Sequence, residues 1–213
     1  MYMPAHFEES RMDVLQALVR AHPLGTLVTM TAAGLEANHL PFQIDPDPAP
    51  FGTLRGHVAR ANRVWRDYSP GIDALAVFSG PHAYVSPGWY PSKRESGKVV
   101  PTWNYAVVHA HGPLRIVDDR EWLRAFVTGL TTRHESTRDQ PWQVSDAPPD
   151  YIDQMLGAIV GIEIPISRIA GKWKVSQNRA PRDREGVAAG LLQAGGEEAM
   201  AMAQMVGESL PEA

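Results

Sequence analysis

The segment Gly56-His57-Val58-Ala59-Arg60-Ala61-Asn62 combines a guanidinium with imidazole and amide groups. The sequence predicts a strand before it and a short helix after it, the helix carrying Asn62, Val64 and Trp65. The first turn of a helix offers unpaired N–H groups and a positive dipole end, and Arg60 can donate two parallel hydrogen bonds to an anion. The segment therefore favours a phosphate site, with an ordinary solvated helix start as the alternative.

A second segment, Val100-Pro101-Thr102-Trp103-Asn104-Tyr105, alternates large aromatic side chains with hydroxyl and amide groups. On a strand, alternate residues point to opposite faces, so one face can pack while the other donates hydrogen bonds to a planar polar ring. A Trp and a Tyr buried in a barrel core are the alternative interpretation.

Two further segments could meet a ligand. Tyr84 to Lys93 is rich in aromatic and turn residues, and three aromatic side chains are costly to expose together, so we expect this loop to cover a ligand or contact a partner. Lys172 to Arg179 ends the last predicted strand with cations, amides and an indole, which could close over an anionic ligand. A solvated strand end anchored by one Trp would look the same.

Several common catalytic sites are missing from the sequence. It contains no G-x-G-x-x-G or P-loop motif, no G-x-S-x-G elbow and no H-E-x-x-H. His109 and His111 would share one face of a strand and could offer two imidazoles to a metal ion, but no third ligand is evident nearby, so no metal site is predicted.

The composition of the chain excludes several classes of protein and of chemical site. The chain has 213 residues, a net charge of −4 and no cysteine. A whole-surface nucleic-acid footprint would need an excess of Lys and Arg, and disulfides, thiolate metal sites and a Cys nucleophile are excluded. The N-terminus lacks the profile of a signal peptide, and no apolar run is long enough to cross a membrane. We expect a cytoplasmic protein.

The elements that must position these groups are mostly strands. A helix is predicted over 10–22, because Met12, Leu15, Leu18 and Val19 recur at helical spacing. Strands are predicted over the ranges 24–31, 35–44, 53–58, 74–79, 83–85, 100–117, 160–164 and 169–175, with a hairpin turn at 32–34 and a possible break in the longest strand at Gly112-Pro113.

Later helices are predicted from Asp118 or Asp119 to about Thr132, from Pro148-Pro149 onwards, and in the tail after Gly186. Strands that follow one another as hairpins favour an antiparallel sheet or barrel with peripheral helices over a doubly wound fold. The predicted domains are 1–185, containing the barrel, and a helical tail at 186–213 that could pack on a neighbouring subunit.

Taken together, these segments resemble the FMN-binding negative transcriptional regulator family, the PaiB-like proteins. The matching pieces appear in family order over nearly the whole chain. They are Met1-Tyr2 with Pro4, His6 and Phe7; Ala37-Asn38-His39-Leu40-Pro41; Gly56 to Asn62; Tyr84 to Tyr90; Val100 to Tyr105; and Lys172 to Asn178.

The resemblance implies an antiparallel split β-barrel, mainly β with peripheral helices, of the pyridoxamine-phosphate-oxidase-like type. It implies a homodimer that binds FMN in a groove between its subunits. The implied cofactor residues are His57, Ala59, Arg60 and Asn62 near the phosphate, Asn38, His39 and Leu40 near the ring or ribityl chain, Trp103 and Asn104 beside the ring, and Lys172 and Gln177 approaching from the C-terminal side. The chemistry of FMN agrees, since it needs cations, short polar groups and aromatic neighbours.

Two functions are compatible with such a flavoprotein. The family name implies a negative transcriptional regulator, and any DNA contact would require clustering of Lys93, Arg94, Lys98, Arg179, Arg182 and Arg184. No helix-turn-helix signature supports this, and a solvated basic rim is the simpler interpretation. The alternative is an FMN-dependent oxidoreductase of the reductase, oxidase or haem-degrading kind, in which the flavin carries the chemistry and no nucleophile is required.

Overall fold

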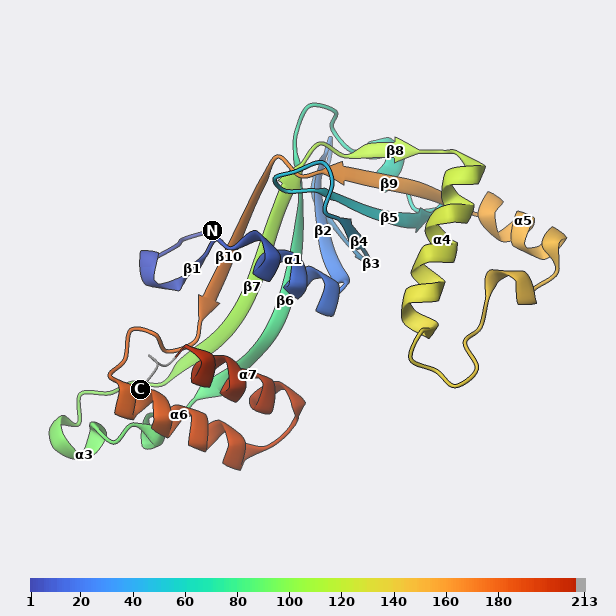
Figure 1. Ribbon diagram of the computed structural model, residues 1–213. Helices are drawn as coiled ribbons and strands as arrows, with labels where there is room; N and C mark the ends of the chain where they lie inside the picture. Colours follow the sequence, from blue (N-terminus) through green and yellow to red (C-terminus); the bar gives the residue numbers. More distant parts are fainter. Residues whose placement is uncertain (210–213) are drawn as a thin grey trace. The chain divides into compact units, whose positions relative to one another are not determined.

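The computed structural model describes residues 1–209 (Figure 1). All the strand pairs with a defined register are antiparallel. The strands are β1 (Glu8–Glu9), β2 (Leu24–Thr31), β3 (Gly34–Pro41), β4 (Gln43–Asp45), β5 (Thr53–Ala59), β6 (Ala74–Val85), β7 (Thr102–Gly112), β8 (Arg115–Val117), β9 (Ile159–Pro165) and β10 (Arg168–Lys174).

Helices account for most of the remaining regular structure. The α-helices are α1 (Met12–Ala21), α2 (Val64–Asp67), α3 (Lys93–Ser96), α4 (Arg120–Glu135), α5 (Pro149–Gly157), α6 (Pro181–Ala194) and α7 (Glu197–Glu208), with 3-10 turns at Ala5–Phe7, Pro87–Trp89 and Val144–Asp146. Within residues 1–209, no helix has the length and apolar character that crossing a membrane requires.

The chain divides into two compact units. Unit 1 consists of Met1–Leu18, Ser79–His109 and Ala170–Ala213, and unit 2 consists of Val19–Phe78 and Ala110–Ile169. The strands β6 and β7 therefore contribute residues to both units.

Unit 2 contains strands of two antiparallel sheets, and apolar side chains from both are buried. The strand β2 pairs with β3 on one side and β6 on the other, and a second sheet has the order β4-β5-β9-β8. Inward-facing residues such as Leu27, Leu54 and Ile162 are fully buried, and the rings of Phe42 and Phe78 meet edge to face at 5.7 Å. Burial of these alternating side chains fixes the register, because a one-residue slip would turn them to solvent.

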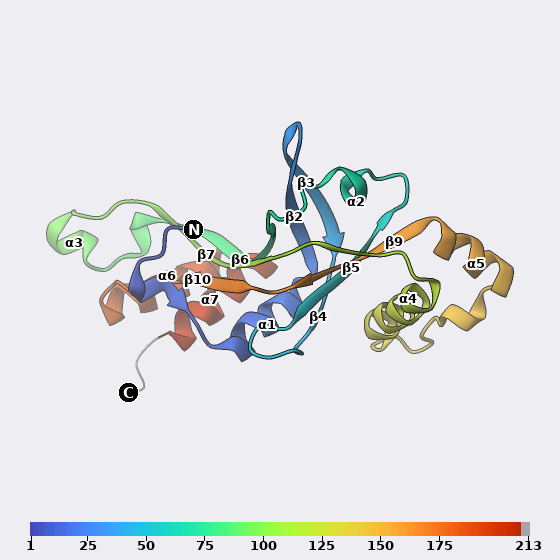
Figure 2. The ribbon, with the colours of Figure 1, turned by 90° about the horizontal axis from the view of Figure 1, so that it is seen from above.

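The hairpin turn and the helix cap predicted from the sequence are both present in unit 2. Gly34 opens β3 with φ of 117°, a conformation that favours glycine after the Ala32-Ala33 turn. The carboxylate of Asp119 accepts a hydrogen bond from the N–H of Trp122 at 2.7 Å and caps α4. The helices α4 and α5 lie side by side in both ribbon views, and Arg124 bonds Asp153 between them at 2.6 Å (Figure 2).

Unit 1 has a core in which the tail helices bury the aromatic loop. Residues Val187, Leu191, Met202 and Val206 of α6 and α7 are fully buried together with Tyr90 and its neighbours. A Cβ on Gly190 would lie 2.3 Å from the indole of Trp89, so glycine is required there for the helix to approach this ring. The sequence prediction that this loop meets a ligand or a partner is not supported at Trp89 and Tyr90, since the chain's own tail packs on both.

Several element boundaries differ from the prediction. The strand β6 is continuous through Gly80-Pro81, where the sequence predicted a break, and β3 and β4 are separate where one strand was predicted. The helix α6 begins at Pro181, so the predicted domain boundary at 185/186 falls inside a helix. The split of the long strand at Gly112-Pro113 is confirmed, with β7 before it and β8 after it.

Candidate functional site

A polar hollow of about 300 Å³ lies in unit 2 beside β3 and β5. Six residues predicted from the sequence to bind the cofactor line it together with three others. The lining residues are Asn38, His39, Leu40, Pro41, His57, Val58, Ala59, Asn62 and Ile159. The structure therefore brings Asn38, His39 and Leu40 of one strand together with His57, Ala59 and Asn62 of another segment.

Two amides form a connected pair at this hollow. The Nδ2 of Asn62 donates to Oδ1 of Asn38 at 2.7 Å, and Oδ1 of Asn62 accepts from the N–H of Val64 at 2.9 Å. Each amide nitrogen carries two donors, and Asn38 Nδ2 makes a long bond of 3.4 Å to Glu36. Hydrogen bonds to the Oδ1 atoms of both amides therefore hold the pair in position, and each Nδ2 keeps an N–H that can donate to a ligand.

His57 contributes a buried imidazole to the same hollow. Its Nδ1 atom is buried without a hydrogen-bond partner, and its ring meets Phe126 edge to face at 5.7 Å. Burial lowers the pKa of His57, because an imidazolium would lose hydration that no neighbour replaces. The ring is thus neutral near pH 7 and keeps an unpaired polar atom, which is unusual in a protein interior.

Arg60 is held by other groups in the chain. Its guanidinium binds both carboxylate oxygens of Asp118, at 2.9 and 2.5 Å, and also donates to the carbonyls of Gly157 and Ile159. The hydrogen bonds from Arg60 lower the pKa of Asp118. Its predicted role as a phosphate ligand remains a prediction, and a phosphate would have to compete with Asp118.

The predicted helix that carries Asn62 is wrong, whereas the predicted phosphate role of Gly56–Asn62 stays a prediction. The helix α2 begins at Val64 and has four residues, so Asn62 lies before it and not within it. The backbone N–H groups of Arg60 and Asn62 already donate to the carbonyls of Ala158 and Ala59, both at 2.8 Å. The strand β9 pairs with the whole of β5, as far as Ala59 opposite Ile159, and the chain turns directly after it at Arg60-Ala61.

The other predicted residues belong to unit 1. Trp103 is 49% exposed, and its ring lies 5.9 Å from that of His82 and 6.1 Å from that of Tyr84. Asn104, by contrast, is 1% exposed and bonds the hydroxyl of Ser176 at 2.9 Å. Trp103 can meet a ligand or a partner, whereas the amide of Asn104 is satisfied inside unit 1.

Lys172 and Gln177 are likewise used within unit 1. The Nζ of Lys172 donates to the carbonyl of Tyr2 at 3.1 Å and lies 5.5 Å from the ring centre of Tyr105. Gln177 accepts from the N–H of Val175 at 2.8 Å and donates to the carbonyl of Trp173. Lys172 therefore ties the N-terminal segment to β10, and Gln177 bonds the backbone on both sides of the end of β10.

The structure adds residues that the sequence analysis missed. Ile159 joins the polar hollow because β9 pairs with β5 across about a hundred residues of chain, and no local pattern signals such a contact. Lys174 bonds Thr102 and the carbonyl of Trp103, and burial with the nearby charges of Lys172 and Arg179 lowers its pKa. Among residues 1–209, no group of three or more His, Asp or Glu side chains is arranged to hold a metal ion.

Comparisons with known proteins agree with this arrangement. A family model described as "Putative FMN-binding domain" matches residues 1–168. An uncharacterized protein of Emericella nidulans is 35% identical over 98% of this chain and 97% of its own length. The protease synthase and sporulation protein PAI 2 of Bacillus subtilis is 32% identical over 99% of this chain and 98% of its own length.

Solved structures show the same fold at low sequence identity. The FAD and heme binding protein of Mycobacterium smegmatis superposes with a TM-score of 0.59 at 16% identity, covering 89% of this chain and 80% of that one. The flavocytochrome Anf3 of Azotobacter vinelandii gives a TM-score of 0.55 at 16% identity, covering 81% and 72%. The predicted antiparallel split β-barrel with peripheral helices is confirmed.

Proposed function

The chain belongs to the PaiB-like family of FMN-binding proteins, and from this premise we propose that it acts as a homodimer with a role in negative transcriptional regulation. FMN is the cofactor of the family domain, which covers residues 1–168. The observation that carries the assignment to this chain is the polar hollow, where six residues predicted from the sequence meet.

The polar hollow fits part of FMN. Spare amide donors of Asn38 and Asn62 suit the oxygens of the ribityl chain and phosphate, while Leu40 and Ile159 provide apolar contact. His57 brings a polar nitrogen that has no partner in the protein. When bound, FMN supplies redox chemistry, and the residues of this chain orient it and keep water away.

Arg60 has a defined place in this proposal. It lies beside the hollow, bound to Asp118, and contacts the phosphate when that carboxylate is displaced. Trp103, Asn104, Lys172 and Gln177 remain proposed ring-side residues. Their bonds within unit 1 favour only Trp103 as a direct contact.

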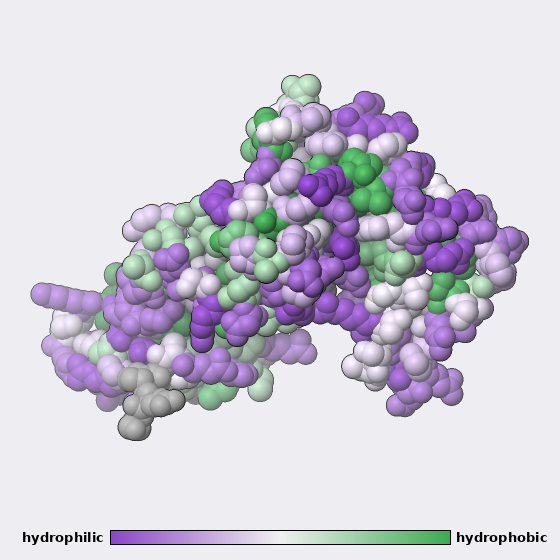
Figure 3. Space-filling view, turned by 45° about the horizontal axis from the view of Figure 1, so that its top comes forward, coloured by the Kyte–Doolittle hydropathy of each residue, from purple (hydrophilic) through white to green (hydrophobic). Residues whose placement is uncertain are grey.

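A homodimer is supported by exposed aromatic surface in unit 1. Tyr84 and Trp103 are 47% and 49% exposed, and the ring of Trp103 lies beside those of Tyr84 and His82. Figure 3 shows that hydrophobic side chains reach the surface in several small groups on the face it presents. Aromatic groups of this kind are enriched at subunit interfaces. The homodimer and the cytoplasmic location remain predictions.

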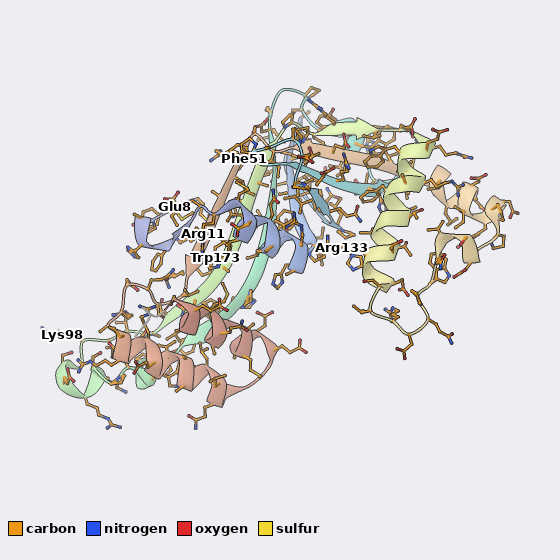
Figure 4. All side chains as sticks on the ribbon, viewed as in Figure 1. Glu8, Arg11, Phe51, Lys98, Arg133 and Trp173 are labelled. Atoms are coloured by element: carbon orange, nitrogen blue, oxygen red, sulfur yellow. The ribbon has the colours of Figure 1, made fainter. Side chains whose placement is uncertain are left out.

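The regulatory role is supported by the relative named for protease synthesis and sporulation, which matches almost the entire chain. Direct DNA contact is supported less well, because three of the six candidate cations are engaged inside unit 1. Arg182 binds Glu95, Arg184 is buried and bonds Ser209, and Arg179 lies over the ring of Tyr90. Lys98, in contrast, lies exposed at the loop after α3 (Figure 4).

This engagement of the cations favours the second candidate, an FMN-dependent oxidoreductase without direct DNA binding. Stopped-flow reduction of the bound flavin by NADH or NADPH separates the two. A flavin that stays oxidised excludes the oxidoreductase, whereas salt-sensitive DNA binding that is lost on changing Lys93, Arg94 and Lys98 to Ala supports the regulator.

The flavin proposal itself is tested on the purified full chain. We expect a yellow protein with the visible bands of oxidised flavin, one FMN per chain and the mass of a dimer by light scattering. After removal of the flavin, titration with FMN should restore the spectrum. A colourless protein that takes up no FMN would contradict the proposal.

A further inference from the structure

A second hollow adjoins the polar one in unit 2. It has a volume of about 340 Å³ and lies among α4, α5 and the segment before α5. Its lining residues are His57, Val127, Thr131, Trp142, Val144, Tyr151, Ile152, Met155, Leu156, Ala158 and Ile159. We call it the apolar hollow, because aliphatic and aromatic side chains make up most of its wall.

The two hollows share part of their wall. His57 and Ile159 line both of them, so the imidazole of His57 stands between the polar hollow and the apolar one. On its other side, the apolar hollow shares Trp142, Val144 and Ile152 with a larger groove of about 700 Å³. The three spaces therefore adjoin one another through shared wall residues.

The lining chemistry selects the kind of molecule that can enter. No residue in the wall carries a formal charge once His57 is neutral, and an unpaired charge brought into such a site would be expensive. Trp142 and Tyr151 remain 44% and 52% exposed, and Met155 is 39% exposed. Exposed aromatic and thioether side chains around a cavity favour stacking on a flat apolar ligand.

We propose that the apolar hollow binds an uncharged, planar aromatic molecule beside the flavin, with His57 positioned between the two ligands. The position beside the flavin rests on the proposed function, but the binding of the aromatic molecule does not. A volume of this size accommodates a ligand of one or two fused rings. Such a molecule is the substrate of an oxidoreductase or the effector of a flavin-dependent regulator.

Binding is tested with 2-naphthol, an uncharged two-ring probe, by isothermal titration calorimetry on the flavin-loaded protein. Naphthalene-2-sulfonate, which has the same rings and one negative charge, is the matched probe. We expect 2-naphthol to bind at least tenfold more tightly than the sulfonate. Equal affinities, or no binding of either probe, would overturn the proposal.

A variant with a charge in the wall tests the location. Met155→Glu introduces a carboxylate at a half-exposed position, where water can still solvate it, and should weaken 2-naphthol binding at least tenfold. Met200→Glu, at an exposed helical position in unit 1, is the control and should leave the affinity unchanged. If Met155→Glu binds 2-naphthol normally, the probe binds elsewhere and the proposal fails.

The position next to the flavin has its own readout. We expect 2-naphthol to change the visible spectrum of bound FMN in the wild type, and Met155→Glu to retain FMN while losing this change. Naphthol binding without any spectral change would contradict the position but not the hollow. A protein that binds 2-naphthol but never FMN would contradict the proposed function alone.

The apolar hollow could also be closed by a second copy of the chain in solution. In that case neither probe would bind, and Met155→Glu would convert the dimer to a monomer in light scattering. That pair of results would overturn the proposal and assign Trp142, Tyr151 and Met155 to a subunit interface.

Discussion

The polar hollow of unit 2 and the region around Asn104 and Lys172 in unit 1 both contain polar side chains predicted to bind FMN, but these side chains are used differently. In the hollow, Asn38 and Asn62 bond each other and keep donors available, and His57 keeps an unpaired Nδ1. In unit 1, Asn104 bonds Ser176, and Lys172 bonds a backbone carbonyl. A ligand site is therefore recognised by polar groups that are fixed in place yet left unsatisfied.

The largest effect should come from the amide pair. Asn62→Leu removes the donors and the contact with Asn38, and we expect the dissociation constant for FMN to rise about 10- to 100-fold. Flavin fluorescence during titration of the flavin-free protein measures this. Asn62→Asp keeps the acceptor for Val64 but adds a charge near the phosphate, and should bind FMN no better than Asn62→Leu. Wild-type affinity in both variants would remove the polar hollow from the flavin site.

Arg60 could either bind the phosphate of FMN or bond only to groups of its own chain, and one pair of variants separates these roles. If it contacts phosphate, Arg60→Ala should weaken FMN about tenfold and riboflavin little, because riboflavin lacks the phosphate. Asp118→Asn, which loosens its hold on the guanidinium, should leave FMN binding intact or strengthen it. If Arg60→Ala weakened the binding of FMN and riboflavin equally, and Asp118→Asn did the same, Arg60 would stabilise the fold and would not contact the phosphate.

Asn104 tests the other half of the comparison, the polar groups of unit 1 that are already hydrogen-bonded within the chain. Asn104→Leu leaves the buried hydroxyl of Ser176 without its partner, and we expect the free energy of unfolding to fall by about 1–2 kcal/mol. Urea unfolding measures this loss, while the FMN dissociation constant should change less than threefold. A stable variant that has lost FMN would instead place Asn104 in direct contact with the flavin.

The smallest effect should be the pH dependence linked to His57. Burial lowers the pKa of His57 below its ordinary value of 6.5, so the unfolded chain binds the proton more readily. The stability contributed by the neutral ring is present above pH 6.5 and is lost as the pH falls below it towards the lowered pKa. We expect the flavin-free His57→Gln variant to lose less stability than the wild type between about pH 6.5 and pH 5.

His111 is the matched control for this measurement, because burial also lowers its pKa. His111→Gln should leave the part of the slope that belongs to His57. Identical pH profiles of unfolding for the wild type and His57→Gln would show that the imidazole is not desolvated in solution.

Local patterns predicted most of the elements. The strand β2 has the predicted bounds, the hairpin turn lies at Ala32-Ala33, and α4 is capped by Asp119. These features depend on side-chain alternation, turn chemistry and capping, which act over a few residues. Boundaries were predicted wrongly where contacts with distant segments decide where a strand ends, as in β6, which continues through Pro81.

Residue patterns along the chain were enough to predict the family, the antiparallel fold, FMN as the cofactor and the residue types that a flavin requires. Which of these residues stay available to a ligand depends on contacts between distant segments. Arg60 and Asn104 are engaged by Asp118 and Ser176, partners 58 and 72 residues away, whereas Asn38, Asn62 and His57 line a common hollow. A hydrogen-bonding group shows its chemistry in the sequence, but whether it is already satisfied depends on the chain segments that fold against it.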